Sequence, residues 1–572
     1  MYDPSKIEQL RELMDNGCSS YGRWETRPDP CRILRLRTFL AGCVEAPPPV
    51  YLHLRARRHW ATFAVAYSSK RSPMPAPPSV RSLPTASKDL VDQRSSEMAA
   101  QVAWASTFDG DLASFEKSLL PRLFAMGRLL VVLMAMARQE RVTAAAGSPV
   151  CRVVRHVRTL VGVVQLVRLY FDGPTPGCPL DRSLALGADK SQFSLLSLAV
   201  RLASRTSFEE AHEILSWFVP EAPSIKAIRQ AALGMGAHGE AFVAQQPAPA
   251  GDGEVLVMQF DSKAIPTATD SELQRRRGPQ ATKNKAASAR HRGRDRRAVR
   301  SPRKRRHPGD KSKNGRITTM VVMYTLKRKN GQLLGPVNKK IFTLMGPKEL
   351  VFQLARAEAT KRGFGPDTRK TVQVVTDGDD DLAELTKKYF PKARHTIDVM
   401  HALEYVAEAG RALHRPGSKA FDTWFEQQRD RLFDDEVDEL VEDLQAALDG
   451  TARRGPGNKG KRKRLEDAVR YLGKRREQMR YDELAAADLE LGSGAVEGAI
   501  KNVVVQRFDR GGMRWTREGA QALQWLRCID RNEDWEAFVE WVRQRSVPTE
   551  GGKLVRLQRK VAAELPKLKQ AA

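Results

Sequence analysis

The sequence is poor in cysteine and lacks the cysteine patterns that bind metal or cross-link a small fold. Its 572 residues include six cysteines, and no two of them form a C-x-x-C pair. This spacing predicts neither a disulfide framework nor a tetrahedral zinc site. We expect a cytoplasmic protein, because chains of this kind are typical of a reducing compartment.

Long apolar runs are missing as well. The longest aliphatic run is Leu129–Ala137, far shorter than the roughly 20 residues that span a bilayer. The first residues do not form a basic segment followed by an apolar one, so no secretory signal is predicted. We therefore expect a soluble, internal protein without a membrane partner.

Acidic residues are too few to balance the basic ones. Lys and Arg number 96 against 68 Asp and Glu, and the formal net charge is +28. Eighteen Lys and Arg but only two Asp lie between Arg275 and Arg316, so this segment carries more than half of the excess. Such a charge favours a nucleic acid or another anionic surface as partner. We interpret the segment as a solvated DNA-binding loop that steepens the salt dependence of binding.

The chain is too long for a single core, and its composition changes along its length. Residues 1–98 are rich in proline and arginine and predict a poorly ordered extension. Residues 99–242 predict a helical DNA-binding region with a short hairpin over Val157–Tyr170. Its last three helices are expected over Ser191–Ser204, Ser207–Trp217 and Ser224–Gly236. They are compatible with a helix-turn-helix reader and equally with an ordinary helical bundle, because no base-reading residue can be identified.

Residues 254–401 predict an α/β domain, interrupted early by the basic loop 274–316. The expected order is three strands, a helix, a strand, a helix and a strand. The strands are Val255–Phe260, Ile317–Leu326, Lys340–Leu344, Val372–Thr376 and Arg394–Ile397, and the helices are 347–362 and 380–389. This order resembles the ribonuclease-H-like fold.

Helices dominate the rest of the chain. A helical insertion is predicted over 402–490. Core helices follow over 491–545, and a basic tail over 546–572. Within the insertion we expect a long amphipathic helix through Phe421–Leu448 with at most one break, a basic loop at Gly455–Arg464, and a helix at Tyr471–Met479.

Three carboxylates stand where strands or a helix would bring them to one point. Asp261 ends the first strand of the α/β domain, Asp377 ends the fourth, and Glu497 begins a helix. Each alone has a plainer explanation, as a turn former, a helix cap or a solvated helix residue. Asp379–Asp381 compete with Asp377, but a carboxylate directly after a strand is held by the sheet. Together the three could hold the two divalent cations that phosphoryl transfer on nucleic acid needs.

Asp398 and His401 lie one helical turn apart, just after the last strand of the domain. Metal ligation by a histidine at this spacing is one interpretation. The other is a helix cap at Asp398 with a hydrogen-bonded His401. We favour a site-supporting contact with DNA or a neighbouring ligand over direct metal binding.

A basic, glycine-containing segment with an aromatic residue follows Glu497. Cations there can neutralise phosphates, and an aromatic ring can stack on a displaced base. Alternatively, one helix ends at Gly511–Gly512, Thr516 caps the next, and the aromatic ring is packed. Both interpretations can hold at once. The candidate DNA-binding residues are Lys501, Arg507, Arg510, Arg514 and Trp515.

Three motifs together resemble a known family. They are Gly492–Lys501, the stretch Gly512-Met-Arg-Trp515 and the pair Asp398-x-x-His401. In these motifs the chain resembles bacterial insertion-sequence transposases of the DDE type, within the Kra-type branch of the Mutator-like superfamily. The resemblance extends over roughly Val150–Trp541.

The resemblance implies a ribonuclease-H-like catalytic core interrupted by an all-helical insertion and preceded by a helical DNA-binding region. It implies Asp261, Asp377 and Glu497 as the catalytic, metal-binding triad, with two Mg²⁺ ions or Mn²⁺ in their place. The expected partners are double-stranded DNA, as element ends and target, and further copies of the chain, at least a dimer on DNA. The expected location is the nucleoid in the cytoplasm.

The sequence also departs from the family. Ser262 follows the first aspartate where glycine is usual, and only Cys151 and Cys178 stand where relatives often carry a cysteine-rich zinc element. Two rival functions stay open. One is a nuclease with the same core that does not transfer strands, and the other is an inactive transposase remnant that only binds DNA.

Overall fold

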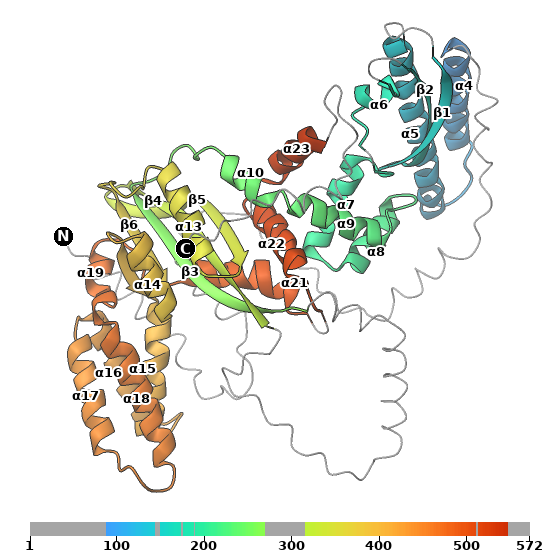
Figure 1. The fold of residues 1–572 in the computed structure, drawn as a ribbon. Helices are drawn as coiled ribbons and strands as arrows, with labels where there is room; N and C mark the ends of the chain where they lie inside the picture. Colours follow the sequence, from blue (N-terminus) through green and yellow to red (C-terminus); the bar gives the residue numbers. More distant parts are fainter. Residues whose placement is uncertain are drawn as a thin grey trace. The chain divides into compact units, whose positions relative to one another are not determined.

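The computed structural model describes residues 87–143, 149–172, 176–187, 189–268, 315–510 and 513–546. Almost all of the expected extension 1–98, of the basic loop 274–316 and of the tail 546–572 lies outside the described residues. The chain divides into two compact units. One holds the described residues of Gly236–Phe538, and the other holds those up to Met235 together with 539–546. Each unit is described by itself (Figure 1).

The unit before Gly236 consists of helices and one two-stranded hairpin. Its elements are α4 (Ser87–Ser106), α5 (Leu112–Thr143), β1 (Cys151–Thr159), β2 (Gly162–Tyr170), α6 (Pro179–Ser183), α7 (Phe193–Arg205), α8 (Phe208–Phe218) and α9 (Ile225–Gly236). The predicted hairpin is confirmed, with Thr159 paired to Gly162. The predicted triplet α7–α9 is also confirmed, and Ser207 and Glu210 form a capping box at the start of α8.

Two helices begin this unit. Asp111 accepts a hydrogen bond from the Ser114 N–H at 2.7 Å and so begins α5 as a new helix after α4. Helix α4 begins at Ser87, so the last residues of the expected extension 1–98 are helical.

Helix α5 is unusually long and apolar. It packs near the hairpin through Ala135, which shares a core with Val157 and Val164. An 18-residue window of α5 has a mean hydropathy of 1.8, and 6% of that window is buried, so the helix could cross a membrane by length and composition. Length and composition alone are weak grounds for such a span. The absence of a membrane partner stays a prediction.

The second unit is built on a five-stranded mixed sheet. Its first elements are α10 (Gly239–Gln245), β3 (Val255–Pro266), β4 (Gly315–Lys329), β5 (Gln332–Met345), α13 (Glu349–Lys361), β6 (Thr371–Thr376), α14 (Asp380–Tyr389) and β7 (Arg394–Ile397). The predicted order of strands and helices is confirmed. Across the sheet the order is β5-β4-β3-β6-β7. The first three strands pair antiparallel, and β3, β6 and β7 run parallel.

Helix α10 falls where the sequence predicted the end of the DNA-binding region and a linker. The Phe242 ring meets that of Phe538 at 5.2 Å between centroids, and a Cβ on Gly239 would touch the Trp525 side chain. The helix therefore packs in the same core as α22 (Arg517–Arg531).

Strand β3 is longer than predicted, and this changes the setting of Asp261. Parallel pairing with β6 ends at Gln259, but antiparallel pairing with β4 continues to Pro266. Asp261 therefore lies inside β3, opposite Met320, and not at its end. It still lies just past the point where the parallel part of the sheet stops.

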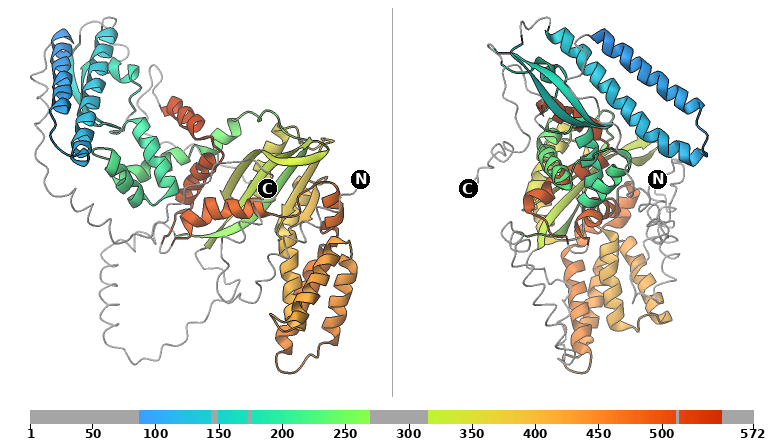
Figure 2. Two further views of the ribbon diagram at one scale, coloured as in Figure 1. Left: turned by 180° about the vertical axis from the view of Figure 1, so that it is seen from behind. Right: turned by 90° about the vertical axis from the view of Figure 1, so that its right-hand side faces the viewer.

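Different helices cover the two faces of the sheet (Figures 1 and 2). On one face, Phe260 of β3 stacks on Phe352 of α13 at 4.0 Å, and both rings are fully buried. On the other face, Thr318 of β4 donates to the Gln524 amide oxygen of α22 at 3.1 Å. Because neighbouring residues of a strand point to opposite faces, Gln259 and Asp261 share the face covered by α22.

The insertion and the C-terminal elements are helical, as predicted. They are α15 (Val399–Leu413), α16 (Lys419–Phe433), α17 (Val437–Gly450), α18 (Asn458–Lys474), η3 (Arg476–Gln478), α19 (Tyr481–Ala486), α20 (Gly494–Ala499), the π-helix η4 (Ile500–Val505), α21 (Gln506–Phe508), α22 and α23 (Trp535–Ser546). Figure 1 shows α15–α18 side by side, projecting from the sheet. The helix predicted through Phe421–Leu448 has one break, between α16 and α17 near Asp435, which has a φ of 61°. Most of the segment expected to be a basic loop at Gly455–Arg464 is the start of α18.

We predict that the stacked pair under the sheet dominates the stability of this unit. Replacing Phe352 with alanine should lower its free energy of unfolding by about 3–5 kcal/mol, because the substitution opens a cavity beside Phe260. Leu334→Ala on β5, where the side chain is 47% exposed, is the control and should cost much less. Urea unfolding followed by circular dichroism measures both, and equal losses would contradict the prediction.

Candidate active site

The pairing of β3 with β6 places two of the predicted carboxylates at the same level. The register joins Gln259 to Val375, and Asp261 and Asp377 each follow two residues later. Paired residues on adjacent strands point to the same face, and that face recurs every second residue. Asp261 and Asp377 therefore lie side by side on the face covered by α22.

Strand β7 adds a third aspartate to this row. Thr376 pairs with Ile397, and the N–H of Asp398 donates to the Thr376 carbonyl at 2.9 Å. Asp398 thus stands level with Asp377 at the carboxyl end of the neighbouring parallel strand. Three adjacent strands, β3, β6 and β7, each contribute one aspartate to a single line across the sheet.

Two buried glutamines bind a distant segment onto the same face. The Gln259 amide donates to the Gly492 carbonyl at 3.1 Å and accepts from the Val496 N–H at 3.0 Å. The Gln373 amide donates to the Glu490 carbonyl at 2.6 Å and accepts from its N–H at 3.0 Å. Each side chain thereby satisfies main-chain groups that would otherwise be buried without partners. The chain just before Glu497 is fixed beneath the row of aspartates.

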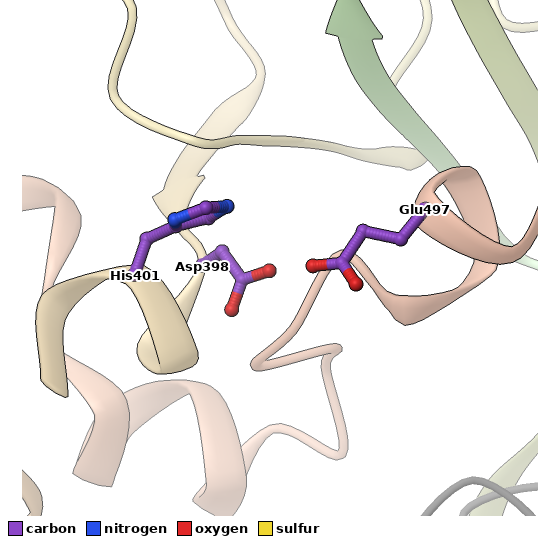
Figure 3. Close-up of side chains that lie close together, drawn as sticks. All are labelled: Asp398, His401 and Glu497. Carbon is purple, nitrogen blue, oxygen red and sulfur yellow. The ribbon is translucent and has the colours of Figure 1, made fainter. Parts of the chain in front are cut away.

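Glu497 reaches the site from α20, directly after this bound segment. The neighbouring Val496 and Val503 are fully buried and Ile500 nearly so, as expected from the apolar face of the helix. Glu497 itself is partly exposed. Figure 3 shows its carboxylate turned toward that of Asp398. The three predicted catalytic residues therefore converge on one face of the sheet.

The Asp398 carboxylate accepts hydrogen bonds from other groups of the protein. Its side chain caps α15 by accepting from the Met400 N–H at 2.7 Å, and it also accepts from the Ser493 N–H at 2.9 Å and from the Ser493 hydroxyl. It is 1% exposed. These contacts tie the end of β7 to the start of α20, and they include the helix cap of the second interpretation.

His401 lies one turn along α15, beside Asp398 (Figure 3). Its Nδ1 is 3.4 Å from the Glu404 carboxylate. The hydrogen bond to Glu404, together with the charges of Asp398, Glu404 and Asp377, raises the pKa of His401 to about 9, against the effect of burial. His401 is thus hydrogen-bonded within the protein, as in the interpretation that pairs it with a helix cap at Asp398.

At Asp261, burial and the neighbouring carboxylates outweigh the attraction of His401. Burial, followed by the charges of Asp377 and Glu497, raises the pKa of Asp261 to about 6, although the Ser262 N–H bond and His401 act in the opposite direction. Like charges that share a buried site disfavour ionisation, and a bound cation would relieve them.

The acidic residues that follow Asp377 are used elsewhere. Asp379 caps α14 and pairs with Lys348 at 2.6 Å, and Asp381 pairs with the same lysine at 3.1 Å. Asp380 pairs with Arg475 at 2.7 Å. The choice of Asp377 as the site residue of this loop is therefore supported.

The donor set fits hard divalent cations. It consists of carboxylate oxygens, the ligands that Mg²⁺ and Mn²⁺ prefer. Among the described residues, the group with ligand atoms all within 4.8 Å of one another is Asp398, His401 and Glu497. The predicted triad spans a wider space. A pair of cations about 4 Å apart needs ligands on both outer sides, each about 2 Å from its cation. Ligand oxygens on opposite sides of such a pair are therefore farther apart than those around a single cation.

The predicted DNA-binding residues fall into two groups. Lys501, Arg510 and Arg514 are exposed. Arg507 and Trp515 are 1% and 9% exposed, with the guanidinium over the indole ring at 4.7 Å. The expectation that Arg507 and Trp515 present their side chains to DNA is not met by this arrangement. The two side chains pack against each other in the core, as in the alternative interpretation in which the aromatic ring is packed.

The residues that assemble the site were not predicted from the sequence. Gln259 and Gln373 lie within apolar strands, and a polar residue at a buried strand position is a signal that could have marked them. Ser493 lies in the recognised motif and binds Asp398. Their partners are more than 90 residues away in sequence, so no local pattern pairs them.

No protein-family model matches this chain, and no curated protein matches its sequence. The function of the chain must therefore be inferred from the geometry of the site.

We predict that metal-free protein is destabilised by ionisation of Asp261. Its pKa is about 6 in the folded chain against 3.8 ordinarily. The loss of folding stability is therefore absent below pH 3.8 and complete above pH 6. Asp261→Asn should therefore raise the free energy of unfolding by up to about 3 kcal/mol at pH 8 and change it little near pH 4.

Urea unfolding in EDTA at the two pH values measures this effect, and the exposed Asp367→Asn is the control. Adding Mn²⁺ at pH 8 should favour the wild-type protein, because a bound ligand stabilises the folded state. A gain from Asp261→Asn that is equal at pH 4 and pH 8 would contradict the assignment.

Proposed function

We propose that this protein is a DDE-type transposase that cleaves DNA at the ends of its insertion sequence and joins the freed 3′-hydroxyl to target DNA. The observation that carries the proposal is the alignment of Asp261, Asp377 and Asp398 on three adjacent strands, with Glu497 brought to the same face. Carboxylates converging at the end of a parallel sheet suit metal-assisted phosphoryl transfer.

The sheet supports a ribonuclease-H-like core as part of this proposal. Its order β5-β4-β3-β6-β7 combines an antiparallel start with a parallel end. The first and fourth strands of the domain, β3 and β6, carry the first two carboxylates. Helices α15–α18 then intervene before Glu497, as expected of an all-helical insertion.

Asp261, Asp377 and Glu497 would hold two Mg²⁺ ions, or Mn²⁺ in their place. When bound, such ions activate an attacking oxygen and stabilise a leaving one. Asp398 and His401 position the surrounding chain. In the first step water attacks the phosphodiester at the element end, and the 3′-oxygen leaves. That 3′-hydroxyl then attacks a target phosphodiester and displaces its 3′-oxygen, so no covalent protein–DNA intermediate forms.

The substrate assignment rests on charge. The chain carries a net charge of +28, which favours a polyanion. Lys501, Arg510 and Arg514 are exposed in the same stretch of chain as Glu497, where they can contact phosphates beside the site. Pairing two ends for transfer requires at least a dimer on DNA, and we include a homo-oligomer in the cytoplasm, associated with the nucleoid, in the proposal.

We predict metal-dependent nicking and joining of DNA by the full-length protein. The test uses labelled duplexes with the DNA sequences on either side of the gene as candidate ends, a target plasmid, and Mg²⁺ or Mn²⁺. Glu497→Gln should reduce both products by more than about 100-fold, because it removes a ligand charge that the transition state needs. The exposed Glu426→Gln on α16 makes the same chemical change outside the row of carboxylates and should act like the wild type.

Each outcome selects one function. Joined product supports the transposase. Nicked product without joining indicates the rival nuclease, and binding without either indicates an inactive remnant. Strand joining by Glu497→Gln at the wild-type rate would refute the proposed site.

A further inference from the structure

The helical insertion makes direct contact with the loop that carries Asp377. The Tyr471 hydroxyl of α18 donates to the main-chain carbonyl of Asp377 at 2.8 Å. Arg475, one turn further along, donates to the carbonyl of Gly378 and to the Asp380 carboxylate at 2.7 Å. Two side chains of the insertion thus bind two consecutive carbonyls of the loop.

The loop backbone is packed tightly against these side chains. Gly378 has a φ of 85°, a region that favours glycine. A Cβ at this position would lie 2.5 Å from the Tyr471 hydroxyl oxygen and 2.9 Å from the Arg475 Nε. The close approach therefore requires glycine at this position.

Tyr471 and Arg475 are themselves held in place. Tyr471 is 6% exposed, and its ring stacks on that of Tyr405 of α15 at 3.8 Å between centroids. The Arg475 guanidinium lies over the Tyr471 ring at 4.3 Å. Burial raises the pKa of Tyr471, so its hydroxyl keeps the proton that it donates. The pair is a rigid support built from two helices of the insertion.

The carboxylate of Asp377 depends on the backbone that this support holds. Its Oδ1 accepts from the Asp379 N–H at 3.0 Å, so side chain and loop form one turn. The Tyr471 hydroxyl holds this turn from the opposite side, through the Asp377 carbonyl. Metal ligands must be fixed to within about 0.5 Å, and neighbouring groups supply that precision.

We propose that Tyr471 and Arg475 are positioning residues, through which the helical insertion fixes the Asp377–Gly378 turn and so orients the Asp377 carboxylate for a divalent cation. The inference rests on the proposed function for the identity of the site. It assigns the insertion a role in metal binding that does not require contact with DNA.

Tyr471→Phe tests the role by removing one hydroxyl and keeping the stacked ring. Mn²⁺ binding to the full-length protein without DNA, measured by electron paramagnetic resonance of free Mn²⁺, should weaken about tenfold. Arg475→Gln should weaken binding similarly, and the nicking rate of either variant should recover when Mn²⁺ is raised. Tyr389→Phe is the matched control, because it removes a hydroxyl that binds Glu349 at 2.7 Å and should leave Mn²⁺ binding unchanged.

Asp377→Asn separates failure of this inference from failure of the proposed function. If Asp377→Asn loses Mn²⁺ affinity but both Tyr471→Phe and Arg475→Gln bind as the wild type does, the positioning role is overturned and the metal site stands. If Asp377→Asn also binds normally, the metal site is refuted and the positioning role with it. If the variants have a lowered thermal midpoint and their nicking rate does not recover at high Mn²⁺, the contact is merely structural and the positioning role is overturned.

Discussion

The site depends on the parallel pairing of β3, β6 and β7. Side chains on paired strands repeat every two residues and share a face at the same level, so the register alone brings Asp261, Asp377 and Asp398 into one row. A slip of one residue in either pairing would turn an aspartate to the opposite face, toward α13 and α14. The buried polar contacts on the site face oppose such a slip, because each would lose its partner.

The order of the strands could be predicted because each strand contains a short apolar run, although β3, β4 and β5 extend well beyond theirs. The fourth strand ends where the sequence predicted, so Asp377 was identified from its position. Asp261 was identified for the same reason but lies within a longer strand, since β3 continues along β4 after β6 has ended. The sequence shows where an apolar run stops, whereas pairing with a neighbour decides where a strand stops.

Other features could not be predicted because they depend on contacts between distant residues. Arg507 and Trp515 have the composition of a DNA-binding surface, yet they are buried against each other. Nothing local distinguishes a buried arginine that stacks on an aromatic ring from an exposed one. Tyr471 marked only a helix in the sequence, and its contact with the Asp377 carbonyl joins residues 94 positions apart.

The two glutamine contacts also determine when the site can form during translation. All five strands have been synthesised once the ribosome has passed Ile397, but the main-chain partners of Gln259 and Gln373 lie at Glu490–Val496. Until that segment leaves the ribosome, both amides and Asp398 lack these partners, and Glu497 cannot reach the sheet. A nascent chain or a product truncated within the insertion would therefore hold an incomplete set of carboxylates. The four carboxylates therefore come together only when synthesis is nearly finished.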